Sequence, residues 1–415
     1  MSGKTEITAG LRGSGWLPNL FPADVRVEIQ SLTTADKAKV TGALYSRGTE
    51  KTVAFFMHPR EFSLAFYAIP YLVKAGIACW AQGSRNAGND IRLEHELALH
   101  DVAAGMNFLR SRNFDQVLCL GVSGGASLLS FYNQQASLLP ADRLDRTPAG
   151  RPTRLNEALM PAVDAFIFVS PHPGQGKLLQ NLIDPSVTDE SDAFSIDPAL
   201  FPFSAENGYA PSPEGARYSD DFIEKYRLAQ VARVGRIDEY AKGCVARRAE
   251  ARRKLKSGNH TDLDAMVAAH QPIFNVWRTD ADPRCFDITL DPSDRSFGSL
   301  WGADPYASNF GAIGFGRVCT PESWLSTWSG LTSRAAFDLT GAAVKQPVLM
   351  VEYTGDNSAF PSDLDDIFST IGSEDKRRVK VRGNHHGLPI ARGEPAGQEA
   401  ACKAIIDWVE DKIGL

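Results

Sequence analysis

The sequence predicts an α/β fold built on a mostly parallel, doubly wound sheet. Two observations indicate this fold: apolar runs alternate with amphipathic helical stretches, and the alternation stops near Pro173 and resumes near Lys345. Strands that alternate with helices imply right-handed crossovers and therefore parallel pairing. Because the same rhythm returns after the interruption, we expect one sheet domain formed by residues 1–172 and 344–415. Residues 173–343, called the insertion below, are expected to form a second, largely helical domain.

The predicted elements follow one another in order along the chain. Two N-terminal stretches, 24–32 and 38–48, alternate in the manner of paired strands. Most later strands are continuous apolar runs, a pattern typical of strands buried on both faces. They lie within 52–59, 77–90, 116–125, 163–173, 345–360 and 376–388, and helical patterns lie within 61–76, 92–112, 126–136 and 397–415. The insertion is expected over the carboxyl ends of the strands, where doubly wound folds bind ligands.

The composition limits the class of protein and its partners. A chain of 415 residues exceeds the usual size of one domain, and its 43% hydrophobic and 23% charged residues are typical of a soluble globular protein. The net charge of -6 argues against nucleic acid or an anionic membrane surface as the main partner. We find no secretory signal, no membrane-spanning run and no CxxC spacing among the six cysteines. We therefore expect a cytoplasmic protein with reduced thiols, and the sequence leaves open whether it forms a homo-oligomer.

The first candidate for chemistry lies where the third buried strand ends. Gly121-Val122-Ser123-Gly124-Gly125 fits the pattern G-x-S-x-G, in which a serine occupies a tight turn from strand to helix. Such a turn requires small flanking residues, lifts the hydroxyl above the sheet and aims the following N–H groups at the same place. An apolar strand precedes the motif and a helical pattern follows it. Ser123 is therefore the expected nucleophile.

The loops after the last two strands supply the partners that a serine nucleophile needs. A serine hydroxyl needs a base, the base needs an orienting acid, and the chain order for this turn is Ser, Asp or Glu, then His. Asp356 follows one predicted strand, and His385 and His386 follow the next, so the insertion precedes the strand that carries the acid. Glu352 lies within the strand pattern itself and is the less suitable acid. His172 ends an earlier strand and could face the same pocket, although we expect an ordinary loop histidine there.

The chain resembles the α/β-hydrolase superfamily over residues 25–172 and 344–415. Members commonly end the last core strand in a Gly-x-Asp-His-aromatic loop. The stretch RGNHHGL matches this loop with Asn384 at the Asp position and His385 as the base. A shift of one residue would make His386 the base, and the doubled histidine departs from the family pattern. The resemblance implies an α/β-hydrolase fold in which the insertion is a lid.

The resemblance also implies an oxyanion hole, which is a set of N–H donors placed where negative charge develops. One expected donor is the backbone N–H of Gly124, directly after Ser123. The other is expected from the loop after the first buried strand, which usually begins His-Gly in this family and reads His58-Pro59 here. Because proline has no N–H, the expected donor is Arg60, and His58 is expected to brace the loop.

The aromatic composition of the insertion favours a hydrophobic substrate. Its aromatic-rich stretches, packed over Ser123, would form a lid with an apolar pocket beneath it. We expect hydrolysis of an ester or lactone of a hydrophobic, aromatic or bulky small molecule through an acyl-serine intermediate. The same residues also serve C–C bond hydrolysis of diketones, amide cleavage and acyl transfer, whereas a non-catalytic ligand-binding relative would lose the triad. No metal-binding spacing and no nucleotide-binding motif is present, so no metal or other cofactor is expected.

Overall fold

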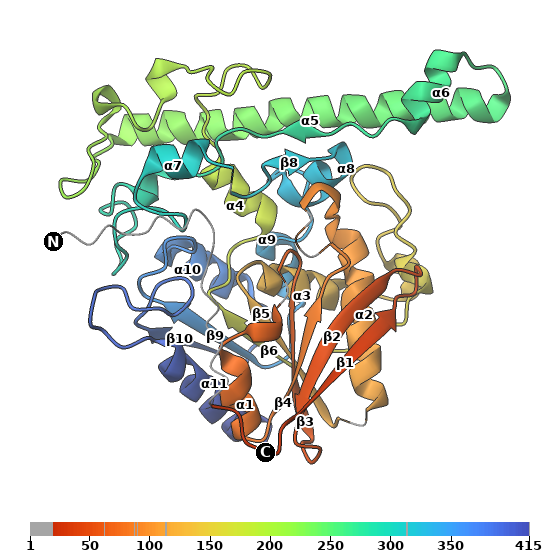
Figure 1. The fold of residues 1–415 in the computed structure, drawn as a ribbon, viewed down its shortest axis with the longest axis vertical. Helices are drawn as coiled ribbons and strands as arrows, with labels where there is room; N and C mark the ends of the chain where they lie inside the picture. The colour runs from red at the N-terminus through yellow and green to blue at the C-terminus, as the bar shows by residue number, and fades with distance from the viewer. Residues whose placement is uncertain are drawn as a thin grey trace.

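The fold is built around one sheet of eight strands (Figure 1). The computed structural model describes residues 20–61, 63–86, 88, 90–112, 114–312 and 314–414. The strands of this sheet are β1 (Arg26–Thr33), β2 (Lys39–Ser46), β3 (Thr52–His58), β4 (Ala78–Gly83), β5 (Gln116–Val122), β6 (Ala165–Val169), β9 (Val348–Tyr353) and β10 (Lys376–Val381). Their order is β1-β2-β4-β3-β5-β6-β9-β10, and only β2 runs against the others. The predicted mostly parallel sheet is thereby confirmed.

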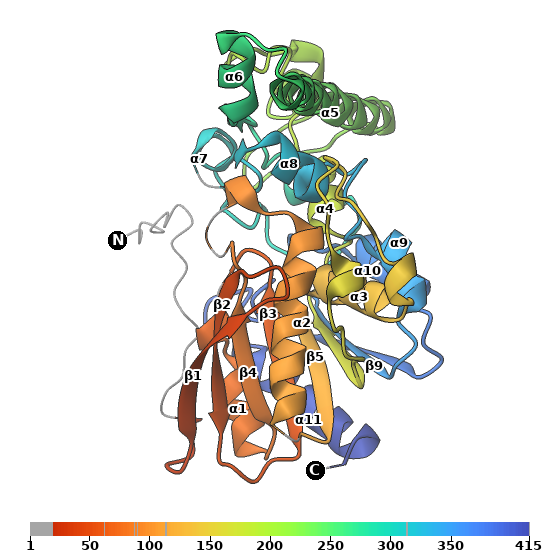
Figure 2. The same cartoon turned by 90° about the vertical axis from the view of Figure 1, so that its right-hand side faces the viewer.

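Helices cover both faces of the sheet (Figure 2). One face carries α2 (His95–Ser111), α3 (Gly124–Ala136) and α10 (Pro361–Thr370), and the other carries α1 (Ala68–Lys74) and α11 (Gln398–Lys412). Strand β3 shows why its sequence is continuously apolar, because all seven of its residues are buried. Val53, Phe55 and Met57 pack under α2 and α3, whereas Ala54 and Phe56 pack under α1. Every position of such a strand therefore meets a hydrophobic layer.

The insertion leaves the sheet after β6 and returns to it at β9. Its elements are α4 (Gln175–Leu182), α5 (Asp220–Ser257), α6 (Asp262–Ala269), β7 (Phe274–Asn275), α7 (Pro305–Phe310), β8 (Val318–Cys319), α8 (Pro321–Ser323) and α9 (Phe337–Thr340). Strands β7 and β8 pair antiparallel as a short ribbon. In Figures 1 and 2, α4, α5, α7 and α8 lie at the end of the molecule beyond α3, which begins where β5 ends. The insertion thus stands over the carboxyl ends of the parallel strands.

The longest element is α5, with 38 residues. The Ser219 hydroxyl accepts the N–H of Phe222 at its start, and Gly258, with a φ of 74°, ends it in the left-handed conformation. A basic stretch, Ala246 to Lys256, forms the last three turns of this helix and is largely exposed. Among the described residues, no helix has the length and apolar character needed to cross a membrane.

The end of the insertion packs into the core of the sheet, and it also contacts the start of the insertion through the ion pair between Asp338 and Lys177. Ala335 and Phe337 belong to the same hydrophobic cluster as β3, β5 and α3. The ring of Phe337 meets that of Phe168 on β6 edge-on, with 5.4 Å between the centroids. The sheet's own core therefore begins several residues before position 344, where the sequence rhythm alone placed the boundary.

Candidate active site

Ser123 lies on a sharp turn between β5 and α3. Its φ of 52° and ψ of -121° lie outside the regions that residues other than glycine ordinarily adopt. Backbone strain of this kind persists only where the surrounding structure fixes it, and it is concentrated at functional sites. The Ser123 N–H donates to the carbonyl oxygen of Val169 on β6 at 3.0 Å. The serine is thereby held at the carboxyl ends of the neighbouring strands β5 and β6.

The glycines around Ser123 are required by close approach of the backbone. A Cβ on Gly121 would lie 2.5 Å from the Cα of Ala126, and a Cβ on Gly125 would lie 2.6 Å from the carbonyl oxygen of Met57. Both neighbours are backbone atoms, which cannot turn aside as a flexible side chain can. Glycine is therefore required at both positions because α3 packs closely against β3 and β5.

Asp356 and His385 form a buried hydrogen-bonded pair. Asp356 follows β9, His385 follows β10, and these strands are parallel neighbours in the sheet. His385 Nδ1 and Asp356 Oδ2 are 2.7 Å apart, and each residue is 2% exposed. Asp356 Oδ1 accepts the N–H groups of Ser358 and Ala359 at 2.7 and 2.9 Å, which fixes the carboxylate. Since the carboxylate accepts, Nδ1 carries the proton and Nε2 is the basic nitrogen of a neutral ring.

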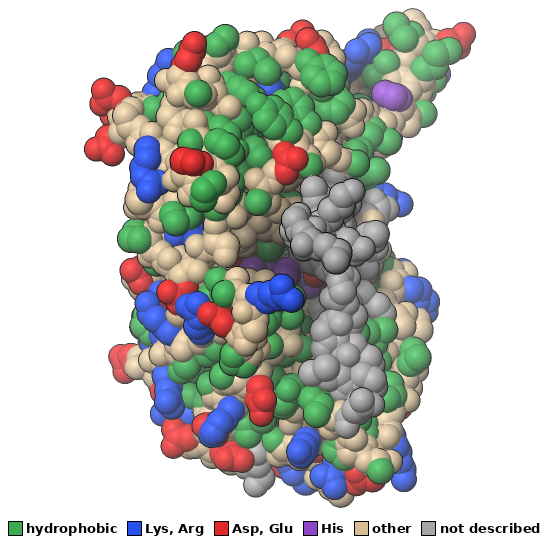
Figure 3. Space-filling view, turned by 60° about the vertical axis from the view of Figure 1, so that its left-hand side comes forward, with side chains coloured by type: hydrophobic (Ala, Val, Ile, Leu, Met, Phe, Trp, Pro, Cys, Tyr) green, Lys and Arg blue, Asp and Glu red, His purple; other side chains and the backbone are tan. Residues whose placement is uncertain are grey.

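Ser123 and His385 line the same cavity, whose volume is about 90 Å³. Figure 3 shows histidine side chains at the bottom of a hollow between the upper and lower parts of the molecule. His386 lines the cavity as well, with its ring 4.9 Å from that of His385. The structure pairs Asp356 with His385, the histidine that the family pattern favours as the base. Other residues in the cavity wall include Phe66, His172, Gln175, Leu300 and Phe315.

The loop after β3 differs from the expected oxyanion hole. The N–H of Arg60 donates to His58 Nδ1 at 3.2 Å, and the N–H of Glu61 donates to the same nitrogen at 3.0 Å. His58 therefore braces the loop as expected, but in doing so it engages the Arg60 N–H that we expected to face the oxyanion. Arg60 could serve that role only after giving up this hydrogen bond.

The Arg60 side chain ties this loop to the insertion. Its guanidinium forms two hydrogen bonds with Asp90, at 2.8 and 2.6 Å. It also lies 5.0 Å from the ring of Phe315 and 5.1 Å from that of Trp328, both in the insertion. Cation–π contacts of this length are attractive, so the loop beside Ser123 and the insertion hold each other in place.

Two cavity residues, His172 and Gln175, were not assigned to the site from the sequence. His172 follows β6, and Gln175 is the first residue of α4; both are 1% exposed. Burial lowers the pKa of His172 well below its usual value, and the neighbouring His58 and His385 lower it further. The position of His172 at the end of a strand beside β5 is the signal that could have placed it here. Gln175 carries no such signal, because it reaches the site through the turn between β6 and α4.

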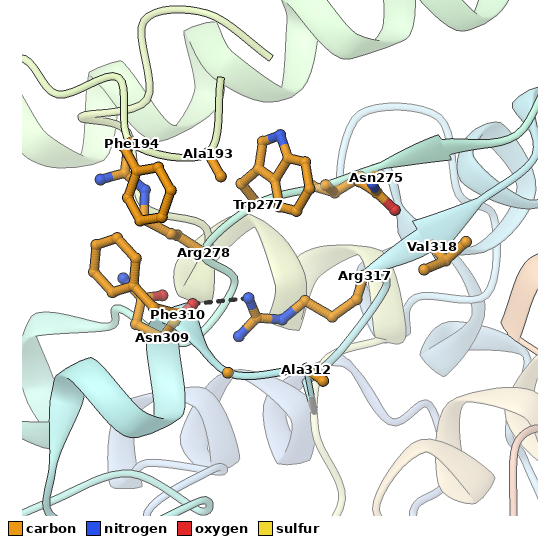
Figure 4. A pocket seen from close by; sticks show the side chains of 12 residues that line it. Ala193, Phe194, Asn275, Trp277, Arg278, Asn309, Phe310, Ala312, Arg317 and Val318 are labelled. Carbon is orange, nitrogen blue, oxygen red and sulfur yellow. Dashed lines mark hydrogen bonds between the residues drawn. The ribbon is translucent and has the colours of Figure 1, made fainter. Parts of the chain in front are cut away.

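A second, larger cavity of about 510 Å³ lies wholly within the insertion (Figure 4). Phe194, Trp277 and Phe310 stand around it, and Arg317 donates to the carbonyl oxygen of Asn309 at 2.8 Å. None of its lining residues borders the cavity of Ser123. Across the described ranges, no group of three or more His, Cys, Asp and Glu side chains is placed to hold a metal ion.

The sheet order and the site together define the class. Seven strands run in one direction, a serine occupies the turn after β5, and Asp and His follow β9 and β10 in the order that belongs to this turn. The chain therefore has the α/β-hydrolase fold. The insertion enters between β6 and β9, ahead of the strand that carries Asp356.

Comparison with known proteins finds similarity only among solved structures, and at low identity. No family model and no curated protein matches the sequence. Among solved structures, the chain is similar to the α/β hydrolase GrgF from Penicillium sp. sh18, at 12% identity and a TM-score of 0.48 over 94% of this chain and 100% of that one. It is also similar to the Pyrococcus furiosus esterase Pf2001, at 9% identity and a TM-score of 0.44 over 95% of this chain and 94% of that one. A third similar structure is Est1E from Butyrivibrio proteoclasticus, at 10% identity and a TM-score of 0.44 over 93% of this chain and 99% of that one. Sequence identities and TM-scores this low do not identify the reaction or the substrate.

Proposed function

We propose that the protein is a serine hydrolase that cleaves a carboxylic ester or lactone through an acyl-serine intermediate. The observation that carries the proposal is the hydrogen bond between Asp356 and His385 beside the cavity that Ser123 also lines. A buried carboxylate on Nδ1 keeps the imidazole in the tautomer whose Nε2 accepts a proton, and it stabilises the imidazolium that forms. The strained turn at Ser123 adds a second indication, since such strain is typical of functional positions.

The proposed reaction has two stages. In the first, Ser123 Oγ attacks the carbonyl carbon while His385 Nε2 takes its proton, and the Gly124 N–H stabilises the oxyanion. The C–O bond then breaks, the leaving alcohol takes the proton from His385, and the acyl group remains on Ser123. In the second stage His385 removes a proton from water, which attacks the acyl-serine and releases the acid. Asp356 holds the ring in both stages.

The cavity wall supports a hydrophobic substrate. Phe66, Leu300 and Phe315 provide apolar surface, and the last two belong to the insertion. A volume of about 90 Å³ holds only a small group, so we propose that the scissile end of the substrate enters here. A bulkier remainder would need the insertion to move away from the loop that carries Arg60.

A panel of substrates tests the reaction type. We would measure turnover of p-nitrophenyl esters, aliphatic lactones, an anilide and a β-diketone by the wild-type protein and by Ser123→Ala. Turnover that is fastest for esters or lactones and lost in Ser123→Ala supports the proposal. Preference for the diketone or the anilide would reassign the reaction on the same residues. Full ester turnover by Ser123→Ala, or no turnover of any substrate by the wild type, would overturn it.

A further inference from the structure

We propose that the side chains of His172 and Gln175 complete the oxyanion hole beside Gly124. The inference rests on the proposed hydrolase function and adds to it the groups that hold the developing negative charge. An oxyanion hole works through two or more donors aimed at one point. The Gly124 N–H is one such donor, but the Arg60 N–H that should accompany it is bonded to His58. The structure places two other donors near Gly124.

The space where a residue at position 124 would carry its side chain is occupied by these two donors. A Cβ on Gly124 would lie 2.7 Å from Gln175 Nε2 and 3.0 Å from His172 Nε2. Only glycine therefore lets both nitrogens come this close to the backbone that follows the nucleophile. Because His172, Gln175, Ser123 and His385 all line the same cavity, an oxygen bound near the Gly124 N–H would be within reach of both side chains.

The hydrogen bonds of His172 fix which of its nitrogens is a donor. Its Nδ1 accepts the N–H of Gly174 at 3.2 Å, so the proton of the neutral ring resides on Nε2. Burial and the two neighbouring histidines hold the pKa of His172 well below its usual value. The ring therefore remains a neutral N–H donor while His385 accepts and releases protons, and it does not compete with His385 as a base.

Gln175 is the second donor, and its amide lacks a partner in the described part of the chain. Both Gln175 Nε2 and Oε1 are buried without a hydrogen bond there. Buried polar atoms are almost always paired in native proteins, since an unpaired one is costly. A leucine or methionine would fill the same space without that cost. The unpaired Nε2 donor is accounted for if a substrate oxygen, which gains negative charge during the reaction, accepts from it.

The test separates stabilisation of the transition state from substrate binding. We would measure kcat and KM for p-nitrophenyl butyrate, and the inhibition constant of a phenyl trifluoromethyl ketone, whose serine adduct carries an oxyanion. Gln175→Leu and His172→Phe are each expected to lower kcat about 100-fold with KM changed less than about threefold. The inhibition constant of the ketone should rise by a similar factor in both variants. The amide nitrogen of His172→Gln reaches about as far as Nε2 of the histidine. The kcat of this variant should therefore be at least about tenfold higher than that of His172→Phe.

Controls keep the inference separate from the proposed function and from folding. Gln230→Leu removes another buried glutamine, which donates to the carbonyl oxygens of Asn181 and Ile183, and should lower the unfolding temperature without changing kcat. Where Gln175→Leu does not fold, Gln175→Met replaces it. A kcat within about threefold of wild type in the His172 and Gln175 variants, or a loss confined to KM, overturns the inference. Ester turnover that survives in Ser123→Ala overturns the proposed function instead.

Discussion

Asp356 Oδ2 holds His385 Nδ1 at 2.7 Å, and the two side chains are almost completely buried. The second oxygen of Asp356 is fixed by the N–H groups of Ser358 and Ala359, so the carboxylate cannot rotate without losing hydrogen bonds. The ring of His385 is therefore held in one orientation and one tautomer, at the cavity that Ser123 lines.

Replacing this carboxylate should cost activity far more than stability. Asp356→Asn can donate to Nδ1 and so favours the wrong tautomer; we expect kcat to fall about 10³- to 10⁴-fold. The exposed Asp366→Asn on α10 is the matched control and should leave kcat unchanged. The measurement is steady-state hydrolysis of a p-nitrophenyl ester together with thermal unfolding. A kcat for Asp356→Asn within tenfold of wild type would argue against the pair's role.

The glycines of the turn should be irreplaceable for steric reasons. Gly121→Ala sets a methyl group against backbone atoms of Ala126 that lie 2.5 and 2.6 Å from its Cβ position. Overpacking of this kind costs about 1–3 kcal/mol of unfolding free energy, and it should also displace Ser123 and reduce turnover. Gly243→Ala in α5 is the control, since its Cβ would meet nothing within 4 Å. That change should stabilise the protein by about 0.5–1 kcal/mol, measured by urea unfolding. Equal effects of the two substitutions would contradict the steric explanation.

Widening the cavity should change the preferred acyl chain. Leu300→Ala removes apolar atoms from the wall that the insertion contributes. We expect the ratio of kcat/KM for octanoyl over acetyl p-nitrophenyl esters to rise at least about tenfold. Leu331→Ala, which removes a half-exposed leucine of the insertion outside this cavity, should leave the ratio unchanged. An unchanged ratio in Leu300→Ala would show that the acyl group binds elsewhere.

Glu94, at the start of α2, should make stability depend on pH. Burial raises the pKa of Glu94 to about 7, and the Arg151 guanidinium 3.2 Å away only partly opposes this. The folded state therefore keeps a proton that the unfolded chain loses near its usual pKa, so stability falls as pH rises from about 4.5 to about 7. The effect can reach about 3 kcal/mol.

Glu94→Gln should remove this part of the pH dependence. The measurement is urea unfolding of both proteins at several pH values between 5 and 8, compared as a difference so that other titrating groups cancel. We expect the unfolding free energy of Glu94→Gln to rise relative to that of wild type from pH 5 to about 7, and the difference to level off at higher pH. A constant difference across the range would mean that Glu94 ionises normally in the folded protein.

Much of the fold could be predicted from the sequence because its signals are local. Continuous apolar runs such as β3 arise from burial on both faces, and the glycines around Ser123 arise from a tight turn that leaves no room for a Cβ. The position of Asp356 and His385 after neighbouring strands followed from chain order alone. The two-residue strands β7 and β8 were not predicted, since so short a pairing leaves no periodic pattern.

Other features could not be predicted because they arise only when distant segments meet. The engagement of the Arg60 N–H by His58 depends on how the backbone turns after β3. The approach of Gln175 to Gly124 depends on how α4 leaves β6. Likewise, the packing of Phe337 against Phe168 could not be predicted, because the alternation of strand and helix patterns resumes only at position 344.

Covalent labelling tests the identity of the nucleophile most directly. We would incubate the intact protein with an alkyl fluorophosphonate and locate the adduct by peptide mass spectrometry. A single adduct on Ser123, absent in Ser123→Ala and slowed in Asp356→Asn, is the expected result. An unmodified Ser123 in protein that still hydrolyses esters, or an adduct on another residue that accounts for the loss of activity, would contradict it.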